Sequence, residues 1–168
     1  MNIYGYCRIS TAKQSIDRQI RNIKAEYPTA HIVQEAYTGT SIFRPEWLKL
    51  YRILKSGDTV VFDSVSRMSR NAEEGFTLYE DLYHKGIRLV FLKEHHIDTE
   101  TYKKALSGSI AMTGTNVDFI LKGINEYLMV LAKEQIKLAF EQSEKEVADL
   151  HQRTREGLLT ARLNGKQV

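Results

Sequence analysis

Short apolar runs alternate with amphipathic helical segments along residues 1–98, and this alternation restricts the chain to few folds. The strand-like runs are residues 3–9, 31–36, 58–65 and 87–94. Between these runs lie segments whose apolar residues have helical spacing, at residues 16–27, 45–56 and 71–85. This order predicts an α/β fold with a mainly parallel β-sheet flanked by helices.

The expected helices carry start and stop signals. Pro45 suits a first helical turn, and Asn71 and Glu74 have the spacing of a capping box. Gly57 and Gly86 suit the residue that follows a helix end. The helix boundaries are therefore predicted from residues inside each segment.

The sequence changes after Asp98. Residues 99–116 are polar and rich in small residues, which predicts a loop or a short helix. Residues 117–163 predict a long helix or helices, with breaks permitted at Gly123 and Gly157 because each costs ~1 kcal/mol relative to alanine. We expect two regions, an α/β domain at 1–110 and a helical region at 111–168 whose apolar face near Leu128 and Leu131 self-associates.

Composition excludes several classes of protein. Hydrophobic residues make up 42% and charged residues 27% of 168 residues, which is ordinary for a globular protein. The single cysteine cannot form an internal disulfide, and no apolar run approaches the ~20 residues that span a bilayer. The start of the chain has no signal-peptide pattern. We therefore expect a cytoplasmic protein.

Basic residues are concentrated early in the chain. Residues 1–70 contain 11 Lys and Arg against 6 Asp and Glu, whereas residues 71–168 contain 13 against 15. Phosphate binding and a solvated basic surface explain this excess equally well.

Polar side chains follow two of the expected strands. Ser10 follows the first strand, on the same face as Arg8, while Arg67 and Arg70 follow the third. The carboxyl ends of parallel strands meet at one edge of a sheet, so these groups should lie close together. Guanidinium groups bind phosphate oxygens bidentately, and clustered positive charge eases ionisation of a serine hydroxyl. A helical turn starting at Arg67 would place Arg67 and Arg70 on one face.

Other chemistries fit less well. None of the five histidines lies in these segments and no G-x-S-x-G occurs, which disfavours a Ser-His-Asp hydrolase. No Walker loop occurs, and Lys13 stands where a phosphatase loop after Cys7 would need arginine. Cys7 is predicted to be a small core residue, and His95 and His96 surface residues. No ligand cluster suggests a metal or another cofactor.

Three motifs together resemble a known family. In order, "YGYCRISTAKQSIDRQI", "EAYTGTSIFRPEW" and "FDSVSRMSRN" resemble the catalytic domain of the serine recombinases, the resolvase and invertase family. The resemblance covers roughly residues 2–98 and resumes at "HQRTREG". It implies site-specific DNA strand exchange without metal or cofactor. Ser10 would attack a phosphodiester, giving a 5′-phosphoserine intermediate and a free 3′-hydroxyl before religation.

The resemblance also implies roles for other residues. The matches to the family's active-site arginines are Arg8, Arg44, Arg67 and Arg70. The matches to polar residues that hold the site are Tyr6, Gln14 and Gln19. The candidates for DNA contacts near the end of the long helix are Lys145, Arg153 and Arg155. The implied partners are double-stranded DNA, a second copy in a homodimer, and a tetramer in the active synapse.

The chain departs from the family pattern at named positions. Ser66 stands where family members commonly carry Asp, and Glu35 where Asp is frequent. The chain also stops soon after "NGK", without the C-terminal DNA-binding domain of family members, so we expect an isolated catalytic fragment. Two alternatives remain: a non-catalytic DNA-binding or regulatory module on the same fold, and a phosphoserine-type hydrolase of small phosphoesters.

Overall fold

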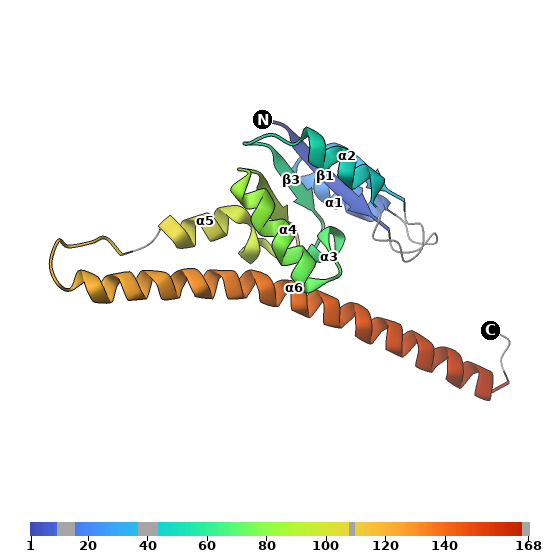
Figure 1. The fold of residues 1–168 in the computed structure, drawn as a ribbon. Coiled ribbons are helices and arrows are strands. Elements are labelled where there is room, and N and C mark those ends of the chain that lie inside the picture. The colour runs from blue at the N-terminus through green and yellow to red at the C-terminus, as the bar shows by residue number, and fades with distance from the viewer. Residues whose placement is uncertain (10–15, 37–43, 108–109, 166–168) are drawn as a thin grey trace.

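The four predicted strands form one parallel sheet in the computed structural model, which describes residues 1–9, 16–36, 44–107 and 110–165. The strands are β1 (Ile3–Arg8), β2 (His31–Glu35), β3 (Thr59–Phe62) and β4 (Arg88–Phe91). Their order is β2-β1-β3-β4 and each neighbouring pair is parallel (Figure 1). The predicted α/β fold is confirmed.

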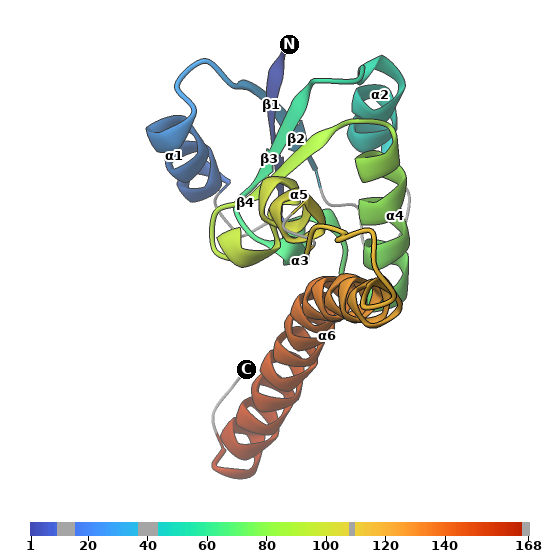
Figure 2. The same cartoon turned by 90° about the vertical axis from the view of Figure 1, so that its left-hand side faces the viewer.

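Helices cover both faces of this sheet (Figure 2). On one face, α1 (Asp17–Glu26) places Ile23 against Cys7, Val61 and Val90, so Cys7 is the core residue that was predicted. The elements over the other face and its edge are α2 (Pro45–Ile53), α3 (Val65–Met68), α4 (Ala72–His84), the 3-10 turn η1 (His95–Ile97) and α5 (Thr99–Ser107). The two apolar clusters are separated by the sheet, because successive strand side chains point to opposite faces.

The predicted helix signals are confirmed. Pro45 opens α2, and the Asn71 side chain accepts a hydrogen bond from the Glu74 backbone N–H at 3.0 Å at the start of α4. Gly86, just beyond the end of α4, has φ +76°, where a side chain would be strained. His95 and His96 are exposed, as expected, although they lie in η1 rather than on a strand end.

The long helix α6 (Asp118–Leu163) is continuous over 46 residues, so the breaks permitted at Gly123 and Gly157 are absent. Two local costs of ~1 kcal/mol do not stop a helix that propagates cooperatively through good helix formers on both sides. At 1.5 Å per residue α6 is about 70 Å long. α5 preceding it is the short helix that was one of the two expectations for residues 99–116.

Only the middle of α6 is buried against the α/β body. Ile136 and Phe140 are buried, and Glu144 accepts a hydrogen bond from the backbone N–H of Ala72 at 2.9 Å. Beyond Glu144 the described side chains are exposed except for half-buried Ala161, and this part projects past the body (Figure 1). None of the helices within the described residues has the length and apolar character needed to cross a membrane.

Candidate active site

The end of β1 lies beyond its last pair with β3, and there a side chain holds it in addition to β2. Gln19 of α1 donates from Nε2 to the Arg8 carbonyl at 2.8 Å, and its Oε1 accepts from the Arg8 backbone N–H at 3.1 Å. Gln19 is only 3% exposed, so this amide satisfies two buried backbone groups where the sheet stops. The predicted Ser10 and Gln14 lie outside the described residues.

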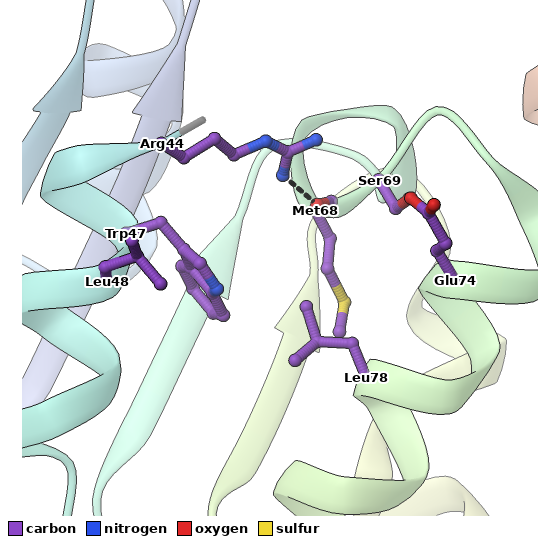
Figure 3. A pocket seen from close by; sticks show the side chains of 7 residues that line it. All are labelled: Arg44, Trp47, Leu48, Met68, Ser69, Glu74 and Leu78. Carbon is purple, nitrogen blue, oxygen red and sulfur yellow. Dashed lines mark hydrogen bonds between the residues drawn. The ribbon is translucent and has the colours of Figure 1, made fainter. Parts of the chain in front are cut away.

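Three arginines meet at the short helix α3. Arg8 donates from Nη2 to the Ser66 carbonyl at 2.8 Å, and Arg44 donates from Nη1 to the Met68 carbonyl (Figure 3). Carbonyls near the end of a helix lack intrahelical partners and accept such bonds readily. Arg67, within α3, donates from Nη1 to the Arg8 carbonyl at 3.2 Å. The predicted approach of the first and third strand ends is confirmed.

Arg70 acts on the same cluster, but it does not share a helical face with Arg67 as predicted. The helix α3 ends at Met68, and Ser69 is extended with φ −151° and ψ 152°, so Arg67 and Arg70 do not share a helical face. Asn71 begins capping α4 immediately afterwards, which leaves no room for a continued α3. The charge of Arg70 nevertheless acts on both Arg8 and Arg67.

Repulsion between like charges is unfavourable within the arginine cluster, which we define as Arg8, Arg44, Arg67 and Arg70. Burial and then the charges of the other three arginines lower the pKa of Arg8 to about 10. Burial likewise lowers the pKa of Arg67. Because like charges gathered out of water repel, an anion bound between them would be stabilised strongly.

Tyr6 and Glu35 fix the neighbouring backbone. The Tyr6 hydroxyl donates to Glu35 Oε2 at 3.3 Å, and the Trp47 backbone N–H donates to the same oxygen at 2.9 Å. Burial and then the Glu35 charge raise the pKa of Tyr6, so the phenol stays protonated at neutral pH. The two residues join β1, β2 and the start of α2, which carries Arg44 at its N-cap.

Ser66 contributes its backbone rather than its side chain to the cluster. Its carbonyl holds Arg8, while its hydroxyl lies 2.7 Å from that of Ser64.

An apolar pocket of about 400 Å³ lies beside Arg44, between α2 and α4 (Figure 3). Trp47, Met68 and Leu78 contribute apolar lining, and Glu74 reaches it from α4. No group of three or more His, Cys, Asp or Glu side chains that could hold a metal ion occurs in the described part of the chain.

Sequence reasoning missed Asp63 and Arg18. Asp63 directly follows β3 and is completely buried, and the charges of Asp63 and Arg18 both act on Arg67. The position of each residue in the sequence was the signal that could have identified it. Asp63 directly follows β3, at the same edge of the sheet as the end of β1, and Arg18 precedes Gln19 on α1.

The residues predicted to contact DNA lie outside the arginine cluster. Lys145, Arg153 and Arg155 are exposed on the projecting part of α6, apart from the arginine cluster. Arg153 and Arg155 are two positions apart, about 200° around the helix, and so lie on opposite sides of it.

Comparisons with known proteins agree on one family. The family model "Resolvase, N terminal domain" matches residues 3–135. A resolvase from Clostridium perfringens is 28% identical over 166 residues, covering 98% of this chain and 74% of that protein. The Tn21 resolvase from Escherichia coli is 31% identical over 91 residues, which cover 54% of this chain and 47% of that protein. The chain therefore spans about three quarters of one relative and about half of the other.

Among solved structures, a resolvase family site-specific recombinase from Streptococcus pneumoniae is 20% identical and aligns with a TM-score of 0.47. The alignment covers 96% of this chain and 98% of that one.

Proposed function

The chain belongs to the family of the resolvase N-terminal domain, and from this premise we propose that it is the catalytic domain of a serine site-specific DNA recombinase. The observation that carries the proposal is the arginine cluster. It gathers around the end of β1, and Ser10 stands two residues beyond Arg8 in the sequence.

Ser10 is the proposed nucleophile. Its oxygen attacks a backbone phosphorus, the bond from phosphorus to the 3′-oxygen breaks, and the products are a 5′-phosphoserine and a free 3′-hydroxyl. Attack by a 3′-hydroxyl of another strand reverses the step and rejoins the DNA, so no external energy source is consumed. The nearby guanidinium charges favour ionisation of the serine hydroxyl.

The four arginines are proposed to bind the phosphate and its developing charge. Arg8 and Arg44 each use one N–H on an α3 carbonyl, and a guanidinium has five, so donors remain for phosphate oxygens. Gln19 holds the strand end, Tyr6 holds Glu35, and Gln14 is proposed as a further polar support. None of these steps calls for a metal ion or another cofactor.

The helical region is proposed to provide assembly and DNA approach. Residues 1–110 would form the catalytic domain and residues 111–168 the dimerisation region, acting in the cytoplasm on double-stranded DNA. Ile120 and Ile124 are exposed on α6, together with Leu128 and the half-buried Leu131, as a homodimer contact requires. A tetramer would form the active synapse.

The exposed basic residues on the projecting part of α6 are proposed to bind DNA phosphates. They are Lys145, Arg153 and Arg155. Because Arg153 and Arg155 lie on opposite sides of the helix, they would contact the two backbones that border one groove. Their contribution would weaken steeply with salt.

The test is covalent capture. The protein expressed from its complete gene is mixed with labelled duplex DNA from the region around that gene, nicked to trap cleaved strands, and run on a denaturing gel. We expect label at the 5′ side of the break to migrate with the protein. Ser10→Ala should abolish this adduct, whereas Ser56→Ala, in the exposed turn before β3, should leave it intact. An adduct that survives Ser10→Ala would refute the assignment of the nucleophile.

Ser66 motivates one alternative, a regulatory module that binds DNA without cutting it. Serine at position 66 supplies no carboxylate to the arginine cluster, and its hydroxyl lies 2.7 Å from that of Ser64. DNA binding by the native protein without any adduct would favour this alternative over the recombinase.

A further inference from the structure

A buried carboxylate lies next to the arginine cluster, and the proposed chemistry has not used it. Asp63 is the first residue after β3 and its side chain is 1% exposed. It lies on the α1 side of the sheet, since its Oδ1 accepts a hydrogen bond from Asn22 Nδ2 of α1 at 2.8 Å. An ionised carboxylate in such a place needs a compensating positive charge.

The contacts of Asp63 with other residues supply only part of that compensation. Its Oδ2 has no hydrogen-bond partner among the described residues and lies 3.4 Å from Lys93 Nζ. The Lys93 side chain is half exposed, so water screens much of its charge. A further cation close to Asp63 would therefore be held firmly.

Arg67 is a cation on which the charge of Asp63 acts, without a direct ion pair between the two side chains in the described structure. It lies four residues after Asp63, in α3, with its Nε buried and without a hydrogen-bond partner in the described structure. Burial lowers the pKa of Arg67, and the charge of Asp63 is the largest influence in the opposite direction. The charges of Arg18 and Arg70 lower the pKa of Arg67 as well, so the Asp63 carboxylate opposes their repulsion of the Arg67 guanidinium.

We propose that Asp63 is a positioning residue: its buried carboxylate is the counter-charge that keeps the Arg67 guanidinium at the Arg8 carbonyl, beside the end of β1. Its catalytic consequence rests on the function proposed above, but the placement of Arg67 does not. Asp63 does not touch DNA in this arrangement and acts only through Arg67.

Three variants separate this role from a structural one. Asp63→Asn removes the charge and keeps an oxygen for Asn22. Asp58→Asn is the matched control, because Asp58 is a carboxylate of a residue only 3% exposed at the opposite end of β3, accepting from the backbone N–H groups of Asn2 and Lys55. The swap Asn22→Asp with Asp63→Asn keeps the 2.8 Å hydrogen-bonded pair and returns one carboxylate to it.

The first measurement needs no recombination activity. Nitrogen-15 NMR follows solvent exchange of the Arg67 Nε proton, assigned by its loss in Arg67→Lys. We expect this exchange to accelerate at least tenfold in Asp63→Asn, to stay at the native rate in Asp58→Asn, and to slow again in the swap. Native exchange in Asp63→Asn would overturn the proposal. If Asp63→Asn does not fold, the swap decides, and fast exchange in a folded swap would overturn it.

The second measurement is the single-turnover rate of adduct formation. We expect Asp63→Asn to lower the rate about 100-fold, the scale of a misplaced catalytic group, with DNA affinity unchanged. The swap should recover part of that rate. If Asp58→Asn lowered the rate of adduct formation by the same factor at the same folded fraction, the role of Asp63 would be structural and the proposal would be wrong. A native protein that forms no adduct would refute the proposed recombinase, and the NMR result would still decide the role of Asp63.

Discussion

Replacing Gly75 of α4 by alanine tests how closely α6 is packed against the α/β body. A Cβ at position 75 would lie 2.5 Å and 2.6 Å from two ring atoms of Phe140 and 3.0 Å from the Ser69 Cβ. Phe140 is buried on α6, and its ring stands edge-on to Phe91 with centroids 6.4 Å apart. The ring therefore cannot turn away without disturbing the core.

Two opposing effects set the size of the change. Alanine gains ~1 kcal/mol of helix propensity over glycine. Carbon atoms prefer about 3.5–4.0 Å, so the overlap with the Phe140 ring is roughly 1 Å, and overpacking of this kind costs about 1–3 kcal/mol. At the upper end of that range, Gly75→Ala should lower the free energy of unfolding by about 1–2 kcal/mol.

The sign should reverse when the ring is removed. Phe140→Ala alone should lower the free energy of unfolding by about 3–5 kcal/mol. In that background Gly75→Ala should raise it by up to ~1 kcal/mol, because the overlap with the ring is gone and only the 3.0 Å approach to the Ser69 Cβ opposes the gain in helix propensity. The two substitutions should therefore show a coupling energy of about 2–3 kcal/mol.

Urea unfolding of the four proteins, followed by circular dichroism, measures these values. Gly123→Ala and Gly157→Ala are matched controls, since nothing lies within 4 Å of a Cβ at either position, and neither should lower stability. The packing of α6 on α4 would be refuted if Gly75→Ala behaved like these controls in the native background.

Three further predictions concern the thiol, a histidine and the arginine cluster. Burial raises the pKa of Cys7 to about 12, so at about pH 8 only ~1 in 10,000 thiols is ionised. Its reaction with a disulfide reagent should be as slow as unfolding, and rapid native-state labelling would contradict its burial. The hydrogen bond with Asp98 raises the pKa of His95, so its stabilisation is present below about pH 6.5 and lost as pH rises through the folded-state value. His95→Gln should therefore reduce the free energy of unfolding more at about pH 6 than at about pH 9 in urea titrations, and equal losses would count against this pairing. Sulfate should raise the melting temperature more than chloride at equal ionic strength, because it relieves repulsion in the arginine cluster. Arg8→Gln should lose this difference and exposed Arg52→Gln should keep it; the opposite pattern would place the anion elsewhere.

The order of strands and helices, and the caps at Pro45 and Asn71, could be predicted from the sequence. These features depend on residues that are near neighbours along the chain, so periodicity and turn chemistry report them directly. The meeting of the Arg8 and Arg67 segments could also be predicted, because parallel strands present their carboxyl ends at one edge. The roles assigned to Ser10 and Gln14 remain predictions.

Only the tertiary structure decided how the site is held. The bond from Gln19 to the Arg8 carbonyl joins residues 11 apart, and that from Arg8 to the Ser66 carbonyl joins residues 58 apart. The burial of Asp63 depends on the simultaneous approach of α1, β4 and α3. Such contacts are set by packing between distant elements, and no local pattern distinguishes a buried aspartate from an exposed one. The chain thus encodes its elements locally, whereas the geometry around Arg67 exists only once those elements have docked.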